Sequence, residues 1–255
     1  MAMRRLAGKV MIVAGGGSGI GAETARRLAD EGAAVLVGDL DGGAAERVAA
    51  RIVADGGTAR GQHCDIADEA SVAALVQAAV REWGGLDGIH VNAADMRALL
   101  DDTDALDVPL DIFDRTLRVN LRGHLLCTRA ALPALLARGG GAIVYTSSGA
   151  ADMGEPTRVS YAVSKSGLQA LMRHVATRWG KAGVRANAIA PGLVLTEQLR
   201  DHFPEDLRLA TLAITRSPRL GRSEDIAAMV AMLMSDDGAW INGQVLGVDG
   251  GARLR

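Results

Sequence analysis

A glycine-rich turn, set between a short apolar run and an amphipathic stretch, constrains the fold of this chain more than any other feature. The run Val10–Ala14 is uniformly apolar, and a helical pattern begins at residue 21. Between them the residues are Gly15, Gly16, Gly17, Ser18, Gly19, Ile20 and Gly21. A strand, a glycine turn and a helix start together form a phosphate cradle, because backbone N–H groups and the positive helix end face the turn. This order predicts that the chain binds a dinucleotide.

Short apolar runs alternate with longer amphipathic stretches along the rest of the chain. The predicted strands are 10–14, 33–37, 88–91, 142–146, 184–190 and 244–248, with a weaker one near 59–63. The predicted helices are 21–30, 44–54, 69–83, 112–138, 160–179 and 223–234. The alternation predicts a doubly wound α/β fold of the Rossmann type, with a mostly parallel seven-stranded sheet and helices on both faces. We expect one domain over 1–255, in which 195–218 forms a mobile insertion that covers the substrate.

The composition excludes several classes of protein. With 28 basic and 30 acidic residues, the net charge of −2 gives no basis for binding nucleic acid or an anionic membrane. No apolar run is long enough to span a bilayer, and the N-terminal residues lack the core and cleavage site of a signal peptide. Cys64 and Cys127 form no CxxC pair, so we expect buried free thiols and a reducing cytoplasm. The five histidines are scattered, and no metal is expected.

Tyr161, one of two tyrosines in the chain, precedes Lys165 by four residues and follows Ser148 by thirteen. In a helix, residues four apart lie on one face with Cβ atoms about 5–6 Å apart. An ammonium fixed beside a phenol favours the phenolate and lowers a pKa that is normally about 10. The pair is therefore a candidate for proton transfer, although by itself it is also consistent with a half-buried tyrosine beside a solvated lysine. The other tyrosine, Tyr145, has Gly149 four residues later and is predicted to pack in the core.

An acidic residue at the end of the second predicted strand indicates which cofactor binds. Asp39 lies eighteen residues after Gly21, close to the interval of about 20 at which an acid bonds the ribose hydroxyls of NAD. Its carboxylate would repel a 2′-phosphate, and no arginine or lysine lies at 16–18 or 40–43 to attract one. The sequence therefore favours NAD over NADP, with the alternative that Asp39 is only a strand-end turn residue.

With these motifs in this order, the chain resembles the short-chain dehydrogenase/reductase family over nearly its whole length, from residue 8 to residue 251. Residues 14–21 are similar to the family's TGxxxGxG motif, and residues 161–165 match its YxxxK motif. The resemblance implies a catalytic set of Asn120, Ser148, Tyr161 and Lys165. In that set the serine polarises the carbonyl oxygen and the tyrosine is the general acid and base. The lysine tunes the tyrosine and bonds the nicotinamide ribose, and the asparagine supports a water that leads to the lysine.

The resemblance also implies the cofactor-binding residues. Residues 64–66 are similar to a pair near the adenine, and 91–94 are similar to the family's NNAG, with Val91 and Ala94 as departures. Residues 187–196 are similar to the segment beside the nicotinamide. The implied cofactor-binding residues are Gly15, Ser18, Gly19, Ile20, Gly21, Asp39, Leu40, Asp65, Ile66, Asn92, Ala93, Ala94, Tyr161, Lys165, Pro191, Val194 and Thr196.

Together these features predict an NAD-dependent oxidoreductase that interconverts a secondary alcohol and a ketone by hydride transfer, with Tyr161 as general acid and base. A 3-oxoacyl, steroid-type or sugar-type reductase of the same family remains open, as does a non-catalytic nucleotide-binding regulator. By analogy with the fold, the pocket walls are Asp95, Met96, Ala150, Met153, Leu193, Leu199, Phe203 and Leu207. The resemblance implies a homotetramer, formed through the helix from Ser160 and through the tail 240–251.

Overall fold

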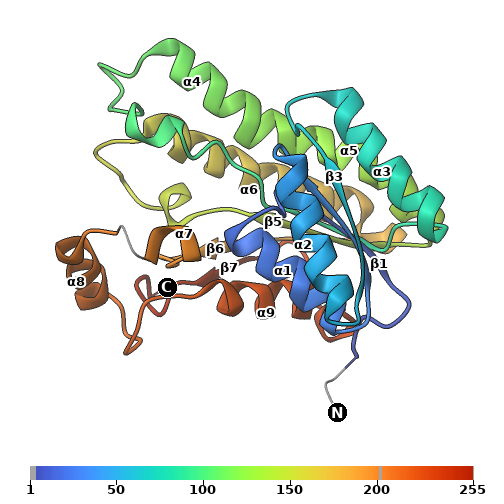
Figure 1. Ribbon diagram of the computed structural model, residues 1–255. Coiled ribbons are helices and arrows are strands. Elements are labelled where there is room, and N and C mark those ends of the chain that lie inside the picture. The colour runs from blue at the N-terminus through green and yellow to red at the C-terminus, as the bar shows by residue number, and fades with distance from the viewer. Residues whose placement is uncertain (1–3, 201–202, 255) are drawn as a thin grey trace.

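The computed structural model describes residues 4–200 and 203–254, and Figure 1 shows its ribbon. Within those residues, seven strands form one sheet in the order β3-β2-β1-β4-β5-β6-β7, and every pair of neighbouring strands is parallel. The strands are β1 (Val10–Ala14), β2 (Ala34–Asp39), β3 (Thr58–His63), β4 (Gly88–Val91), β5 (Gly141–Thr146), β6 (Val184–Pro191) and β7 (Val245–Val248). The predicted doubly wound fold is confirmed, with a sheet that is entirely parallel.

Helices cover both faces of the sheet (Figure 1). They are α1 (Gly19–Asp30), α2 (Gly42–Ala54), α3 (Glu69–Trp83), α4 (Leu110–Leu117), α5 (His124–Ala137), α6 (Val159–Trp179), α7 (Glu197–Arg200), α8 (Glu205–Ile214) and α9 (Ser223–Met234). One apolar cluster joins the sheet to α1, α2 and α9, and a second joins it to α3, α5 and α6. Two cores on opposite faces are what a parallel sheet requires, because both of its faces must be shielded from water.

The central strands can be predicted from the sequence because each is a continuous apolar run. All residues of β1 and β4 are buried, as are all but the first residue of β5. At the sheet edge, β3 has the sequence Thr-Ala-Arg-Gly-Gln-His and no buried residue, which explains why the sequence indicates it only weakly. β1 pairs with β2 on one side and β4 on the other, so the strand order reverses there. Ligands bind at such a switch point, beyond the carboxyl ends of the strands.

The helix predicted over 112–138 is wrong in one respect, because the structure divides it into three parts. A π-helical segment, η2 (Arg118–Gly123), lies between α4 and α5. Asn120, within η2, is fully buried, and its Oδ1 accepts a hydrogen bond at 2.8 Å from the backbone N–H of Asp95. Wider π turns are frequent at functional sites. The hydrophobic pattern does not reveal this turn, since the contact comes from a different segment.

The segment 195–218 has more regular structure than its prolines and mixed charges indicated. It contains α7 and α8, and α8 lies at the margin of the molecule, away from the sheet (Figure 1). No residue of α8 is buried, and Leu207, Leu209 and Ile214 are exposed. The helix begins after Pro204, with Glu205 and Asp206 in its first turn, where acidic side chains favour the helix dipole.

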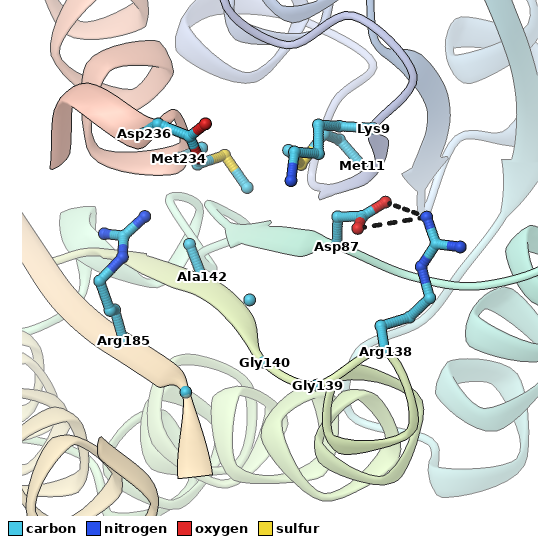
Figure 2. Close-up of a pocket in the computed structure, with 12 residues that line it drawn as sticks. Lys9, Met11, Asp87, Arg138, Gly139, Gly140, Ala142, Arg185, Met234 and Asp236 are labelled. Carbon is cyan, nitrogen blue, oxygen red and sulfur yellow. Dashed lines mark hydrogen bonds and ion pairs between the residues drawn. The ribbon is translucent and has the colours of Figure 1, made fainter. Parts of the chain in front are cut away.

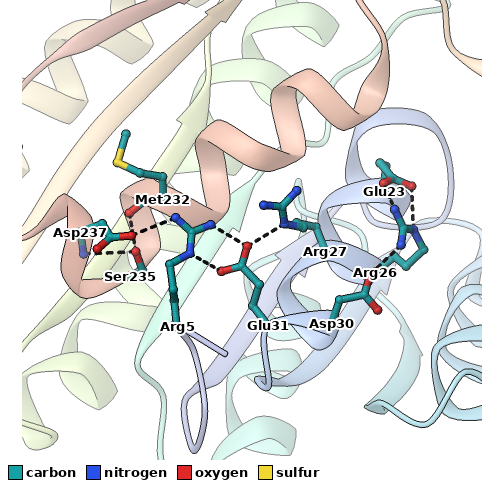
Figure 3. A network of polar contacts seen from close by, with 9 residues as sticks. All are labelled: Arg5, Glu23, Arg26, Arg27, Asp30, Glu31, Met232, Ser235 and Asp237. Carbon is teal, nitrogen blue, oxygen red and sulfur yellow. Dashed lines mark hydrogen bonds and ion pairs between the residues drawn. The ribbon is translucent and has the colours of Figure 1, made fainter. Parts of the chain in front are cut away.

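The N-terminal segment is joined to the body by an ion network at the amino edge of the sheet (Figure 3). Arg5 donates to both carboxylate oxygens of Glu31, at 2.7 and 2.6 Å, and to Asp237 at 3.0 Å. Arg27 donates to the same Glu31 carboxylate at 2.6 Å. Burial would raise the pKa of Glu31, but the bonds from Arg5 and Arg27 outweigh it and hold the pKa below its usual value. The network links the end of α1 to the segment that follows α9.

Candidate active site

The residues predicted to form the site lie together at the carboxyl ends of the strands. Each short segment that follows a strand contributes to this edge, and the contributing segments come after β1, β2, β3, β4, β5 and β6. Together with the last residues of β2 and β6, they contain Gly15–Gly21, Asp39–Leu40, Asp65–Ile66, Asn92–Ala94, Ser148 and Pro191–Thr196. Because parallel strands place all their carboxyl ends on one edge, sequence order alone gathers these residues.

The glycine loop has the close packing that a phosphate-binding turn needs. Gly15 has a φ of +83°, and a Cβ on it would lie 2.5 Å from the backbone nitrogen of Ala93. A Cβ on Gly21 would overlap the carbonyl oxygen of Gly15. Ser18, the N-cap of α1, is exposed, and its side chain makes no capping hydrogen bond. The turn therefore presents bare backbone at the start of α1, and these residues fit a bound pyrophosphate.

Asp39 lies against the glycine loop. Its Oδ2 accepts a hydrogen bond from the backbone N–H of Gly17 at 2.8 Å, and its Oδ1 accepts from Asp41 at 3.0 Å. The carboxylate thus acts as a strand-end turn residue and also places a negative charge beside the turn. Leu40 follows it with an exposed side chain.

A chain of hydrogen bonds connects the glycine loop to β5. Asn92 donates through Nδ2 to the carbonyl of Gly15 at 3.0 Å, and its Oδ1 accepts from the Thr146 hydroxyl at 3.0 Å. With that hydroxyl donating to Asn92, Nε2 of His90 donates to Thr146 Oγ1 at 2.9 Å. Burial lowers the pKa of His90 to about 3, so the ring is neutral. Asn92 therefore anchors the end of β4 as expected, despite Val91 and Ala94 in place of the family's usual residues.

Ser148, Tyr161 and Lys165 meet beside the end of β5. Ser148 follows β5, and its Oγ accepts a hydrogen bond from Ala150 at 3.2 Å. Tyr161 and Lys165 lie on α6, with the lysine Nζ 5.5 Å from the centre of the tyrosine ring. Lys165 is fully buried, and its Nζ donates to the carbonyl of Thr146 at 2.8 Å. The structure brings this predicted trio together.

The ionisation of the pair differs from the sequence-based expectation. Burial raises the pKa of Tyr161, and an interaction with the Ser148 hydroxyl lowers it by less. Nζ of Lys165 lies 5.5 Å from the centre of the phenol ring and donates to the Thr146 carbonyl. Burial also lowers the pKa of Lys165 to about 8. The net pKa of Tyr161 is therefore raised, where the sequence indicated a lowered value, and the effect of Lys165 on the phenol stays a prediction.

Three of the remaining predicted residues lie in separate segments of the chain. Asn120 lies in η2, and its Nδ2 is buried without a hydrogen-bond partner among the residues the structure describes. The Asp65 carboxylate accepts a hydrogen bond from the N–H of Ala67 at 2.8 Å and so closes a turn, within which Ile66 is buried. Thr196 approaches the glycine loop, since a Cβ on Gly19 would lie 3.1 Å from its methyl group.

Backbone pairing fixes the positions of two further residues predicted to bind the cofactor. Pro191, at the end of β6, pairs with Val248 of β7. Val194 is buried and forms an isolated bridge with Gly221.

The predictions for the two cysteines and Tyr145 are confirmed: both thiols are free and buried, and Tyr145 is buried with its hydroxyl 2.7 Å from that of Thr128.

Sequence reasoning missed one residue at the site. Asp102 is buried, and its carboxylate accepts hydrogen bonds from the backbone N–H groups of Ser160 and Tyr161 at 3.0 and 2.8 Å. Its neighbours Asp101 and Asp104 are exposed, so the local sequence gives no signal that separates it from surface acids.

Two cavities lie away from the Ser148–Tyr161–Lys165 cluster. The first, of about 240 Å³, is at the amino edge of the sheet and is lined by Lys9, Arg138 and Arg185 with Asp87 and Asp236 (Figure 2). The second, of about 310 Å³, lies at the carboxyl ends of β6 and β7. Its lining includes Leu193, Thr215, Gly221 and Asp249. Within residues 4–200 and 203–254, no helix is long and apolar enough to cross a membrane.

The fold and the site define a Rossmann-type protein with a glycine loop at the switch point and a Ser–Tyr–Lys cluster beside it. Comparison with known proteins gives the same result: residues 14–253 match the family model described as enoyl-(acyl carrier protein) reductase. The chain belongs to the short-chain dehydrogenase/reductase family.

Similar proteins cover almost the whole chain. A probable short-chain type dehydrogenase/reductase of Bradyrhizobium diazoefficiens is 45% identical over 249 residues, 98% of this chain and 89% of the relative. The D-threitol dehydrogenase of Mycolicibacterium smegmatis is 39% identical, over 98% of this chain and 95% of the relative. Among solved structures, a 7α-hydroxysteroid dehydrogenase complexed with NADH and 7-oxo glycochenodeoxycholic acid has a TM-score of 0.91 and 33% identity, covering 99% of this chain and 98% of that chain.

Proposed function

We propose that this protein is an NAD-dependent oxidoreductase that interconverts a secondary alcohol and a ketone. The observation that carries the proposal is the meeting of Ser148, Tyr161 and Lys165 beside the glycine loop, with Nζ of Lys165 5.5 Å from the Tyr161 ring. Residues 149 to 160 separate the serine from the tyrosine, so only the fold brings them together. The 7α-hydroxysteroid dehydrogenase of similar structure binds NADH, which supports a nicotinamide cofactor here.

The chain's own residues account for cofactor binding. Bare backbone at Gly15–Gly21 and the start of α1 would hold the pyrophosphate, since the loop lacks side chains that would obstruct it. Asp39 would accept the ribose hydroxyls and repel a 2′-phosphate, which favours NAD. Lys165 on α6 and Asn92 at the end of β4 would also contact the cofactor. The segment Pro191–Thr196 would hold its nicotinamide end. The bound nicotinamide would supply the hydride acceptor or donor.

The proton then moves through Tyr161. Its phenol would accept the alcohol proton in oxidation and return it in reduction, while Ser148 holds the substrate oxygen by a hydrogen bond. In the conformation described here the phenol is protonated near neutral pH, because burial raises its pKa. Release of Lys165 from Thr146 would let its ammonium approach the phenol and the ribose. Asn120, in η2, would support the water that leads to Lys165.

Exposed apolar side chains indicate a substrate class. Met96, Met153, Leu199 and Leu207, predicted as pocket walls, have exposed apolar side chains. An apolar rim favours a small or medium alcohol or ketone with a hydrocarbon frame. Relatives named for D-threitol and for a hydroxysteroid show that similar chains act on very different alcohols. A 3-oxoacyl or a sugar-type substrate therefore stays within the proposal as an alternative.

We also propose a homotetramer of single-domain subunits located in the cytoplasm. Leu125 and Leu136 on α5 and Val163 on α6 are exposed apolar side chains on neighbouring helices, and Trp240 is fully exposed. Such side chains are suited to contact between copies of the chain. Light scattering at micromolar protein concentration tests the assembly, and a single monomer peak would contradict it.

The experiment that tests the activity compares Tyr161→Phe with Tyr145→Phe. Both changes remove one phenolic hydroxyl, but that of Tyr145 contacts only buried Thr128 among the described residues. A panel of alcohols with NAD or NADP, and of ketones with NADH, is followed at the NADH absorbance. We expect Tyr161→Phe to abolish hydride transfer while NADH binding persists, and Tyr145→Phe to remain active. Near-normal kcat in Tyr161→Phe would contradict the role proposed for Tyr161. NADH binding by a wild type that is inactive on every panel member would favour the regulator alternative.

A further inference from the structure

The loop between β4 and α4 contains a buried carboxylate that the proposed mechanism does not use. Asp102 is 3% exposed, whereas the neighbouring acids Asp101, Asp104 and Asp107 are exposed. A charged side chain is seldom buried unless it is fully hydrogen-bonded. The contacts of Asp102 therefore have a specific structural consequence.

Among the described residues, the side-chain hydrogen bonds of Asp102 go to the first turn of α6. Its Oδ1 accepts from the backbone N–H and the hydroxyl of Ser160, at 3.0 and 2.7 Å. Its Oδ2 accepts from the backbone N–H of Tyr161 at 2.8 Å. The Asp102 carbonyl also accepts from the N–H of Arg158 at 2.9 Å. Asp102 thus holds the peptide groups on both sides of Ser160, the residue before Tyr161.

Helix α6 has no cap of its own. Arg158, at the N-cap position, has a φ of +63° and makes no side-chain capping bond. The first N–H groups of a helix have no partner within the helix, so they need one from outside. Asp102 supplies it from 58 and 59 residues away, and its negative charge lies at the positive end of the helix dipole.

The same loop is tied to η2 at its other end. The N–H of Asp95 donates to Asn120 Oδ1 at 2.8 Å, and Arg115 of α4 pairs with Asp95 at 2.5 Å. The loop from Asp95 to Asp102 therefore connects the π-helical segment with the start of α6. The loop thus contacts the side chain of Asn120 and the backbone of Tyr161.

We propose that Asp102 is a positioning residue that sets the location of the Tyr161 phenol relative to Ser148 and Lys165. Its catalytic consequence rests on the proposed function, but its effect on the tyrosine does not. Asp102→Asn is the sharpest probe, because Oδ1 can keep both contacts to Ser160 while the new amide N–H₂ faces the N–H of Tyr161. Asp102→Ala removes every side-chain contact. Asp104→Asn is the control, since among the described residues the Asp104 side chain accepts only from the nearby N–H groups of Leu106 and Asp107.

The positional test uses NMR of protein labelled with ¹³Cζ-tyrosine. The chain has two tyrosines, so two resonances are expected, and Tyr161→Phe assigns them. Asp102→Asn should move the Tyr161 resonance by more than its line width and leave that of buried Tyr145 in place. Asp104→Asn should move neither. An unmoved Tyr161 resonance, or equal movement of both tyrosines from general loosening, overturns the proposal.

The kinetic test separates positioning from simple loss of folded protein. With the panel alcohol that wild type turns over fastest, Asp102→Asn should lower kcat at least tenfold, with the dissociation constant for NADH within about twofold of wild type. Ser160→Ala, which removes only one of the three side-chain bonds, should stay within about threefold. If kcat and NADH-binding capacity fall in the same proportion, Asp102 is only structural and the proposal fails. Since the NMR readout needs no turnover, it decides the proposal even where the proposed activity is absent.

Discussion

The ammonium of Lys165 donates a hydrogen bond to the backbone carbonyl of Thr146 at 2.8 Å, and the hydroxyl of the same threonine bonds Asn92 at 3.0 Å. Asn92 in turn bonds the carbonyl of Gly15 in the glycine loop. The lysine that neighbours the candidate catalytic tyrosine is thus connected to the phosphate loop through two residues, Thr146 and Asn92. A change at Lys165 is therefore expected to affect both ends of this chain of contacts.

Lys165→Met should weaken cofactor binding as well as turnover. Methionine fills much of the buried volume but has no ammonium to bond the ribose or approach Tyr161. We expect the dissociation constant for NADH to rise about tenfold or more and kcat to fall by at least 10³, measured by fluorescence titration and by the absorbance assay. Tyr161→Phe is the matched comparison, with kcat reduced and NADH affinity retained. Unchanged NADH affinity in Lys165→Met would contradict a ribose contact.

Asp39→Asn should reduce the preference for NAD. The change removes the negative charge beside the glycine loop and keeps an oxygen that can accept from Gly17, which now bonds Asp39 at 2.8 Å. We expect the ratio of kcat/KM for NAD to that for NADP to fall at least tenfold, or by about 1.4 kcal/mol. Asp41→Asn is the control, because Asp41 caps α2 through Ala44. An unaltered ratio in Asp39→Asn would show that Asp39 is a turn residue alone.

Gly21→Ala should abolish cofactor binding, because the new methyl group would overlap the carbonyl of Gly15 and displace the turn. Gly154→Ala adds the same methyl group where no atom lies within 4 Å, and should be neutral. NADH titration and thermal unfolding measure the two effects. Wild-type affinity in Gly21→Ala would mean that the turn adapts without loss of its binding geometry.

Stability should fall steeply below about pH 6, because two histidines are buried in the neutral form. Burial lowers the pKa of His90 to about 3 and that of His124 well below its usual value. The unfolded chain protonates these rings near pH 6.5, so their contribution is complete above that pH and is lost as the pH falls toward the folded values. Each adds up to about 1.4 kcal/mol per pH unit to the slope.

The histidine prediction is checked by urea unfolding at pH 7.5 and pH 4.5. His90→Gln keeps an amide that can donate to Thr146 and removes one titrating group. We expect a smaller loss of the free energy of unfolding between the two pH values in this variant. An identical loss in wild type and variant would assign the acid sensitivity to other groups.

The sequence predicts most of the fold because its central strands are buried on both faces. β1, β4 and β5 appear as short apolar runs with sharp ends, and their observed bounds differ from the predicted ones by at most one residue. The glycine loop and the Tyr161–Lys165 spacing are local, so they too are visible without a structure. Even Ser148 is placed, because it lies two residues after a predicted strand.

Features that depend on contacts between distant segments were not predictable. The π turn at Asn120 depends on the N–H of Asp95, and the cap of α6 depends on Asp102, an acid among several in its segment. The hydrogen bond of Lys165 to the Thr146 carbonyl likewise joins α6 to β5. In each case a polar group found its partner across the fold, and no periodicity records such partners.

The strand order described above also has a consequence for how the chain acquires its structure. Every neighbour in the sheet is parallel, and Met11 of β1 is paired with Gly88 of β4, so this pair can close only after the intervening chain has looped back. Such distant pairing slows folding and leaves apolar strand edges open in the meantime. Recovery of this protein from denaturant should therefore depend strongly on protein concentration, with dilute refolding giving the higher yield.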